Sequence, residues 1–227
     1  MADEKENTII STEERWERIE NYFNENKKVV STIGVIILLV VVGYFGLTNW
    51  YIPTQEAEAE VAVAHAQSYF SMDSVNKAIN GDRSSLGFEA IADQYSWTPT
   101  GHLANYYLGL CYYQKKDYQK AIDYLDKFNS GDVLVSANAA GVMGDAEMQL
   151  NHPDKALEDY LTAVKRNENN FTAPIYLKKA GGVCEQQANY TQAVSLYERI
   201  KTDYHASPEA MEIDKYISRA KAKGGLM

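Results

Sequence analysis

The stretch LGLCYYQKKDYQKAIDYLDKF, residues 108–128, decides the fold, because its spacing of small and large residues recurs twice farther along the chain. Three glycines are each followed, twelve residues later, by an alanine: Gly109 and Ala121, Gly144 and Ala156, Gly181 and Ala193. A large side chain comes four residues after each alanine: Leu125, Tyr160 and Tyr197. The units are offset by 35 and then 37 residues (144 − 109 and 181 − 144), a period typical of repeated helical hairpins.

Close packing between helices gives this spacing its physical meaning. A small residue in each of two helices lets their backbones approach, and the large residue fills the space toward the next hairpin. Turn-forming residues separate the two helices of each unit, at 116–117, 151–154 and 188–189. Asp117 and Asn189 are suitable N-caps for the second helix, and Pro153 suits its first turn.

This pattern resembles the tetratricopeptide repeat (TPR) family, in which a Leu-Gly pair and an aromatic residue mark the first helix and Ala and Phe mark the second. The first unit is the most similar, through Leu108, Gly109, Tyr112, Ala121, Leu125 and Phe128. The leading Trp of the family is replaced by Asn105, Ala140 and Leu177. The resemblance implies an all-α fold, a TPR-like α-solenoid with repeats at 102–135, 137–170 and 174–207.

The segments that flank the three repeats also have helical patterns. In the region 51–99 we expect a long helix from Glu56 to Ile79 and a second helix from Ser85 to Tyr95, which together make a degenerate first hairpin. Residues 208–223 are expected to form a capping helix, because the last repeat of a stack needs its apolar face covered.

An uncharged apolar segment precedes the repeats. Val29 to Trp50 contains 22 residues, about 33 Å as a helix, which is enough to cross the hydrocarbon of a bilayer. We therefore predict a single N-terminal transmembrane helix at 29–50. A buried core helix and a cleaved signal peptide are the alternatives, the latter because Ala57-Glu58-Ala59 has the small-x-small pattern of a cleavage site.

The distribution of lysine and arginine predicts the orientation of this helix. The tail 1–28 carries Lys5, Arg15, Arg18, Lys27 and Lys28, whereas the other side has no lysine or arginine before Lys77. The positive-inside rule therefore places the tail in the cytoplasm and the repeats on the exported side. Within the tail, residues 12–23 are expected to form an amphipathic helix that lies on the membrane or contacts a partner.

Nothing in the sequence indicates catalysis, a metal, a cofactor or a small-molecule substrate. The four histidines are scattered, and no Gly-rich phosphate loop follows a strand. The net charge of −9 argues against nucleic-acid binding, which needs clustered lysine and arginine. Cys111 and Cys184 fall two repeats apart, so we expect two free, mostly buried thiols. The chain is therefore not expected to be an enzyme.

A binding groove is expected where the first helices of TPR units line a concave surface. The register places these residues on the concave surface: Leu103, Tyr106, Leu110, Tyr113, Asn138, Gly141, Asp145, Met148, Ile175, Lys178, Gly182 and Glu185. Among them, the candidates for contact with a partner are Leu103, Tyr106, Leu110, Tyr113, Asp145, Met148, Lys178 and Glu185. Such a groove is aromatic at one end and polar to acidic at the other. The alternative is that the long N-terminal helix covers some of these tyrosines.

The layout of the whole chain resembles the YfgM-like ancillary subunit of the bacterial Sec translocon, with a short cytoplasmic tail, one signal-anchor helix and a periplasmic TPR domain. Segments such as 73–75, 80–82 and 101–104 are similar to TPR membrane proteins of Bacteroidetes-type bacteria. The resemblance implies the bacterial inner membrane and contact with SecYEG and a PpiD-like membrane-anchored chaperone. Two alternatives stay open: a scaffold for another envelope machine, in secretion, gliding or cell division, and a subunit of an enzyme whose partner carries the active site.

Overall fold

A computed structural model describes residues 12–226, and in this part of the chain all regular secondary structure is helical. The all-α prediction is therefore confirmed, and the one pairing of extended backbone among the described residues is an isolated bridge between Gly81 and Leu86. The chain divides into two compact units, Met1–Pro53 and Thr54–Met227, which are described separately.

The first unit contains the apolar segment. It consists of α1 (Thr12–Glu25), α2 (Lys27–Gly46) and η1 (Leu47–Tyr51), a short π-helical turn. No residue of α2 is buried. Within the described residues, one helical stretch, Lys27–Ser71, contains a segment that is long and apolar enough to cross a membrane. The side chains of Trp16, Tyr22 and Phe23 on α1 are also exposed.

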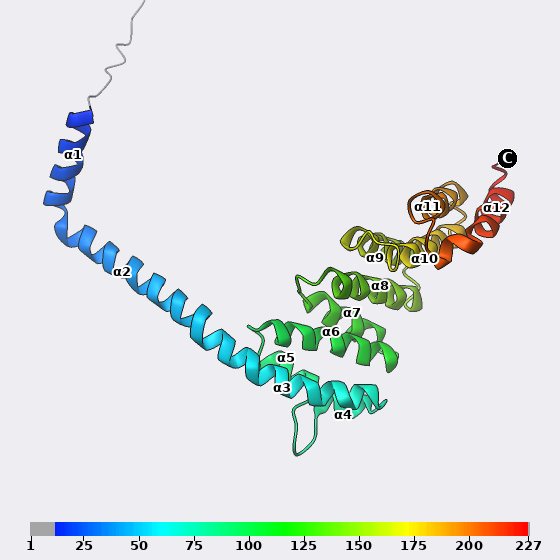
Figure 1. Cartoon of the computed structure of the whole chain (residues 1–227), viewed down its shortest axis with the longest axis horizontal. Coiled ribbons are helices and arrows are strands. Elements are labelled where there is room, and N and C mark those ends of the chain that lie inside the picture. The colour runs from blue at the N-terminus through cyan, green and yellow to red at the C-terminus, as the bar shows by residue number, and fades with distance from the viewer. Residues whose placement is uncertain (1–11, 227) are drawn as a thin grey trace, which may run out of the picture. The chain divides into compact units, whose positions relative to one another are not determined.

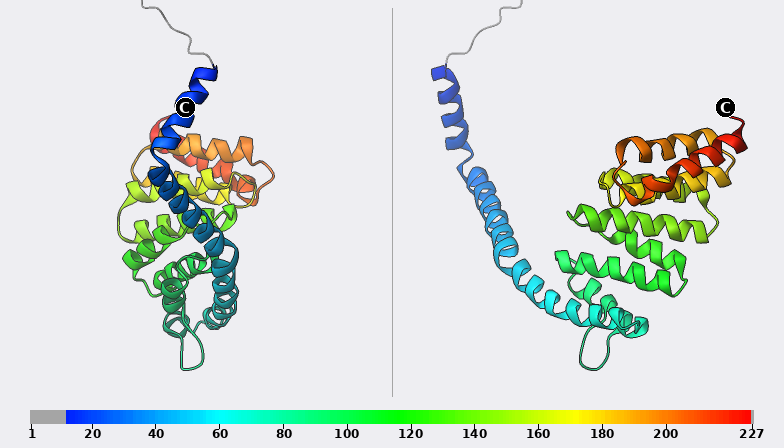
Figure 2. Two further views of the ribbon diagram at one scale, coloured as in Figure 1. Left: turned by 90° about the vertical axis from the view of Figure 1, so that its left-hand side faces the viewer. Right: turned by 45° about the vertical axis from the view of Figure 1, so that its right-hand side comes forward.

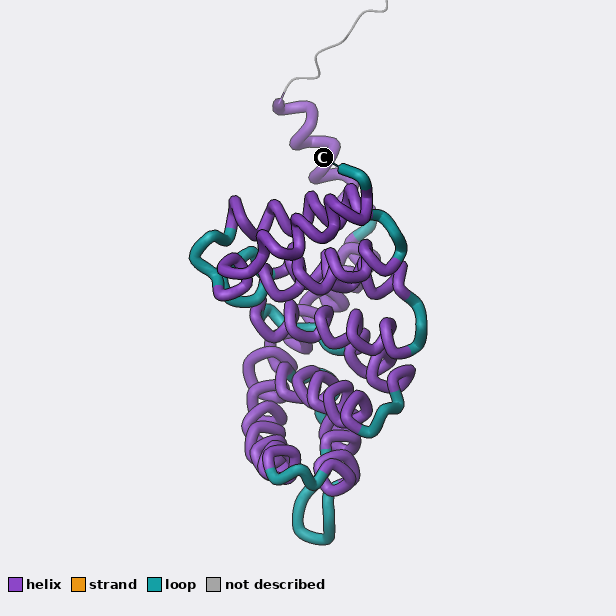
Figure 3. The backbone as a smooth tube through the Cα atoms, turned by 90° about the vertical axis from the view of Figure 1, so that its right-hand side faces the viewer, coloured by secondary structure: helices purple, strands orange, loops and turns teal. Residues whose placement is uncertain are grey.

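The second unit is a stack of helical hairpins (Figures 1 and 2). Its helices are α3 (Ile52–Ser71), α4 (Val75–Asn80), α5 (Phe88–Gln94), α6 (Pro99–Gln114), α7 (Tyr118–Lys127), α8 (Val133–Gln149), α9 (Pro153–Arg166), α10 (Ala173–Gln186) and α11 (Tyr190–Asp203), followed by η2 (Pro208–Glu212) and α12 (Ile213–Gly224). Figure 3 shows these helices as successive layers joined by short loops. We call the first helix of each hairpin an A helix (α3, α6, α8 and α10).

The small residues of the repeat pattern lie where helices approach closely. A Cβ on Gly109 would lie 2.4 Å from Leu125 Cγ, and one on Gly144 would lie 2.7 Å from Tyr160 Cε1. Gly181 is in the same position relative to Tyr197. The partner alanines in the second helices are fully buried: Ala121, Ala156 and Ala193. Each large residue thus packs onto the glycine of its own hairpin.

The turn inside each hairpin has the same backbone geometry in four places. Asp73, Lys116, Asn151 and Ala188 adopt positive φ angles of 58°, 63°, 62° and 58°. In each turn the next N–H donates to the carbonyl five residues earlier, at 2.8–2.9 Å, as from Asp117 to Tyr112 and from Asn189 to Cys184. This is the Schellman motif, which satisfies the last carbonyls of the A helix.

The first of these turns corrects one expectation. The prediction of a single helix from Glu56 to Ile79 is wrong, because the turn at Asp73 ends α3 and a new helix starts at Val75. The segment expected as a helix from Ser85 is helical only from Phe88. The capping segment begins as a 3-10 turn, η2, before it becomes α12. Hairpin α3–α4 therefore precedes the three units found from the sequence.

Candidate interaction surface

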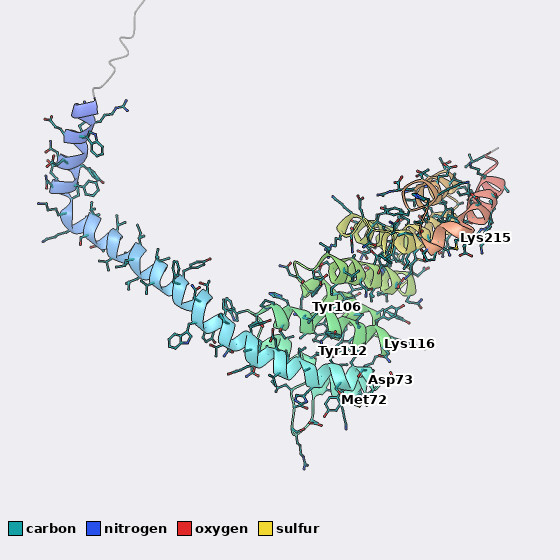
Figure 4. The ribbon with its side chains drawn as sticks, viewed as in Figure 1. Met72, Asp73, Tyr106, Tyr112, Lys116 and Lys215 are labelled. Atoms are coloured by element: carbon teal, nitrogen blue, oxygen red, sulfur yellow. The ribbon has the colours of Figure 1, made fainter. Side chains whose placement is uncertain are left out.

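The A helices lie side by side and run in the same direction, which gives the stack one continuous face. At their N-terminal ends, the Glu56 carboxylate of α3 accepts hydrogen bonds from the Thr100 N–H (3.1 Å to Oε2) and hydroxyl (2.7 Å to Oε1) of α6. At their C-terminal ends, Gln114 of α6 donates to Asp73, just after α3. Figure 4 shows Met72, Asp73 and Lys116 together at this end and Tyr106 away from it. We call this surface the A-helix face.

A ladder of polar side chains crosses the A-helix face. Asn138 of α8 donates to Tyr106 Oη of α6 at 2.8 Å and accepts from Tyr176 Oη of α10 at 3.1 Å. Burial raises the pKa of Tyr106. Burial, together with the nearby charge of Asp145, also raises the pKa of Tyr176 to about 12. Both phenols therefore stay neutral and hold three helices in register.

A second rung is charged. Lys179 of α10 pairs with Asp145 of α8 at 2.7 Å, and Tyr160 Oη donates to the same carboxylate at 2.7 Å. The ammonium group also lies 5.6 Å and 5.8 Å from the ring centroids of Tyr160 and Tyr176. A cation over aromatic rings and beside a carboxylate is a favourable arrangement when it is partly desolvated. Asp145 is thus already engaged within the protein.

The C-terminal segment covers the third repeat. Lys178 pairs with Glu212 of η2, and its ammonium lies 4.8 Å from the ring centroid of Tyr216 on α12. The side chain of Glu185 is only 7% exposed, and it pairs with Arg219 at 2.6 Å. Lys178 and Glu185, the two charged α10 residues expected in an open groove, are therefore held by the C-terminal helices.

A cavity of about 380 Å³ remains beside these ion pairs. Its lining includes Ile175, Gly182, Tyr216 and Arg219. Ile175 is 40% exposed, and a Cβ on Gly182 would meet no atom within 4 Å. This volume lies in the range of sites that hold a side chain or a small ligand. The cavity is the hollowed part of the A-helix face.

The other groove candidates take different places. Leu103 and Leu110 are partly buried against a core cluster that contains Leu125 and Ala139, and Tyr106 is buried within that cluster. Tyr113 packs against the cluster that contains α3 residues and makes an edge contact with Tyr118. Met148 is partly buried against the C-terminal core cluster. The eight candidates thus belong to the A helices, but most fill contacts between helices instead of lining one open channel.

Two residues of this surface were not among the groove positions: Tyr176 and Lys179. They matter because they connect α10 to α8 through a hydrogen bond and an ion pair. Their partners, Asn138 and Asp145, lie 38 and 34 residues away in the sequence, and residue spacing along one helix carries no signal for contacts of this kind.

The described residues contain no candidate metal site. No group of three His, Cys, Asp or Glu side chains in residues 12–226 has the arrangement to hold a metal ion.

A further cavity of about 560 Å³ lies between α5, α6 and α7. At its wall, the Glu89 carboxylate accepts hydrogen bonds from Tyr112 and Tyr124, whose rings stack 5.3 Å apart.

Comparisons with known proteins agree with this architecture. Residues 88–131 and 142–210 match the family described as Tetratricopeptide repeat. The fold is similar to the crystal structure of MamA protein, with a TM-score of 0.59, 18% sequence identity, and coverage of 74% of this chain and 83% of that one. No curated protein sequence matches significantly. The second unit is therefore built from tetratricopeptide repeats, an architecture that serves protein–protein interaction.

Proposed function

We propose that this tetratricopeptide-repeat chain is a membrane-anchored scaffold that binds other proteins on the exported side of a bacterial inner membrane. The observation that carries the proposal is the direct succession of an apolar helix, α2, which is uncharged after Lys28, and a repeat stack whose A-helix face contains an open cavity. The scaffold itself performs no chemistry. Its contribution is to hold partners close to the bilayer.

The exposed side chains of α2 support the membrane anchor. Residues such as Leu38, Leu39 and Val40 are 60–66% exposed. Contact of this apolar surface with water would cost free energy, whereas contact with lipid would not. A single helix in lipid satisfies its backbone hydrogen bonds internally. Lys27 and Lys28 at its start, with no further lysine or arginine before Lys77, favour a cytoplasmic N-terminus.

The partner site that we propose is the cavity beside Ile175 and Gly182. An exposed apolar side chain, the aromatic ring of Tyr216 and the absence of a side chain at Gly182 leave room for an inserted residue of the partner. Aromatic and arginine side chains around such a pocket are enriched where binding energy concentrates. The ion pairs of Lys178 and Arg219 fix the pocket walls.

The most specific assembly that we propose is the Sec translocon, with SecYEG and a PpiD-like periplasmic chaperone as partners. The arrangement of tail, anchor and repeat domain supports this assignment, because it brings a binding surface to the place where exported chains emerge. The second candidate is a scaffold subunit of another envelope machine, for secretion, gliding or cell division, since the same arrangement serves any assembly at this membrane.

Site-specific crosslinking in living cells tests both the proposed partner site and the proposed assembly. A photo-crosslinking residue at Ile175 should capture a partner, whereas the same residue at Ser195, exposed on α11, is the matched control. Capture of SecY or a periplasmic chaperone at Ile175 alone supports the translocon assignment, and capture of another envelope component supports the second candidate. Equal capture at both positions, or none, would contradict the partner site.

The topology is tested separately. Alkaline phosphatase fused after Met227 folds to its active form only outside the cytoplasm, so an active fusion supports the exported orientation. If that fusion is inactive and the reporter is active when it precedes residue 12 instead, the chain has the opposite orientation in the membrane.

A further inference from the structure

Exposed apolar side chains gather along one edge of the repeat stack. We call it the loop edge: the side where segments 95–98, 128–132, 167–172 and 204–212 lead into the next A helix or the C-terminal helices. Each of these crossings, or the first turn of the helix that follows it, has a large apolar side chain that is more than half exposed: Trp97 at 80%, Val133 at 57% and Leu134 at 52% at the start of α8, Phe171 at 79% and Met211 at 89%. The opposite edge, formed by the turns inside the hairpins, has one such residue, Met72.

More than half of the surface of each of these side chains is not packed against the stack. Trp97 and Phe171 directly precede Thr98 and Thr172, the N-cap residues of α6 and α10. A hydrophobic residue in this position often packs against the first turns of its helix. Here the two rings remain about four-fifths exposed, so their apolar surface is available to something outside the stack.

The entry point of the chain shows what lies near this edge. Glu56 is hydrogen-bonded to Thr100 at the start of α6, so the stack begins at the loop edge. Glu56 is six residues after Trp50, the end of the apolar segment, and six residues reach at most about 20 Å even when fully extended. If α2 crosses a bilayer, as proposed above, the first layer of the loop edge lies near the bilayer surface.

The loop edge carries charges of both signs, and they do not by themselves attract a lipid surface. Lys127 ends α7, and Lys165 and Arg166 lie in the last turn of α9. None of the three forms an ion pair with any residue that the structure describes. The charged side chains inside the crossing segments are all acidic: Asp132, Glu168, Glu209 and Glu212. Two of them are already paired, Glu168 with Arg199 and Glu212 with Lys178 and Lys215. The edge is therefore mixed in charge and apolar at its tips, which favours interfacial contact over purely electrostatic attraction.

We propose that the loop edge rests on the lipid surface, with Trp97 and Phe171 in the headgroup region. Tryptophan is suited to this depth because its ring is apolar and its N–H can still meet water. The inference rests on the membrane anchor proposed above and adds an orientation. The A helices then stand on the bilayer by their N-terminal ends, and the A-helix face opens alongside the membrane.

Tryptophan quenching by brominated lipids tests this orientation in the full chain, reconstituted in vesicles of phosphatidylcholine with phosphatidylglycerol. The chain has three tryptophans, so replacing two of them by Phe leaves Trp50 or Trp97 as the single probe. Two further probes lack all native tryptophans: one has Phe171→Trp, and the matched control has Met72→Trp on the opposite edge. Far-UV circular dichroism confirms that each variant remains helical.

We expect lipids brominated near the headgroup to quench Trp97 and the Phe171→Trp probe about twofold or more above the Met72→Trp control, as for residues at interfacial depth. Quenching of Trp50 without stronger quenching of both edge probes than of the control overturns the orientation but leaves the anchor intact. Absence of quenching at Trp50 overturns the anchor, and the orientation with it.

Discussion

The ring of Tyr176 on α10 lies directly over Gly141 on α8. A Cβ placed on Gly141 would be 2.0 Å from Tyr176 Cε1 and 2.5 Å from its hydroxyl oxygen. The ring cannot swing away freely, because its hydroxyl donates to Asn138 and Lys179 lies near its face. The second and third repeats therefore meet through a glycine that no other residue can replace without a shift.

Gly141→Ala should destabilise the repeat stack by about 1–3 kcal/mol, because the added methyl group overpacks the contact with Tyr176. Denaturation in detergent, monitored by circular dichroism, measures the change in the free energy of unfolding. Gly182→Ala is the matched control, since its Cβ would meet nothing within 4 Å. The control should stabilise its helix by up to about 1 kcal/mol through helix propensity. Equal effects of the two substitutions would contradict the packing.

Ala156→Leu tests the repeat register that was derived from the sequence. Ala156 is fully buried, and its carbonyl oxygen would lie 3.2 Å from a Cβ on Gly144. A leucine there should cost roughly 1–3 kcal/mol by overpacking the hairpin. Ala64→Leu, at an exposed position inside α3, is the control and should leave the denaturation midpoint nearly unchanged. An unchanged midpoint for Ala156→Leu would count against the register.

The sequence predicted the helical hairpins because their packing depends on local spacing. Gly109 and Ala121 mark two helices that face each other within one unit, so the pattern can be found along the chain. The α3–α4 hairpin was missed because Ala66 stands in place of the glycine and the segment 81–87 with α5 lengthens the offset between turns to 43 residues (116 − 73). Its Ala66 and Ala78 nevertheless keep the twelve-residue spacing.

The open or filled state of the A-helix face could not be predicted in the same way. Lys178 and Glu185 have the spacing of groove residues, but Glu212 and Arg219 of the C-terminal helices hold them. These partners are 34 residues away, and their placement depends on how η2 and α12 dock. Long-range ion pairs of this kind leave no periodic signal.

Ala188→Gly should stabilise the protein. Ala188 adopts a φ of 58° in the third Schellman turn of the predicted repeats, and a left-handed conformation costs an L-residue with a Cβ about 1–2 kcal/mol. Glycine has no such cost but loses more entropy on folding, so we expect a net gain of about 1 kcal/mol. Asn151→Gly should gain less, because asparagine tolerates this conformation. A larger gain at Asn151, measured by thermal unfolding, would contradict the argument.

Both cysteines should react slowly in the folded protein. Cys111 and Cys184 are free and fully buried. Burial raises the pKa of Cys111 to about 12 and also raises the pKa of Cys184, so little thiolate is present at neutral pH. A thiol reagent should find two groups after denaturation without reductant and almost none before it. Fewer than two thiols in the denatured chain would indicate a disulfide.

Asp159 gives the repeat stack a pH dependence of known sign. Burial, with the charges of Glu147 and Glu158, raises the pKa of this half-buried carboxyl group on α9 to about 6. An unfolded aspartate has a pKa near 3.9, so between these values the folded state binds more protons. The contribution of Asp159 to the free energy of unfolding therefore falls as the pH rises from about 4 to about 6.

Asp159→Asn should consequently stabilise the protein at pH 7, where the carboxylate is charged in both states. Allowing for the solvent that still reaches this side chain, the gain is about 1 kcal/mol. At about pH 4 or below the carboxyl group is largely protonated when folded, so the gain should shrink. Asp126→Asn, at an exposed position on α7, controls for the loss of one negative charge. A gain for Asp159→Asn that is the same at both pH values would show that burial of the charge is not its cause.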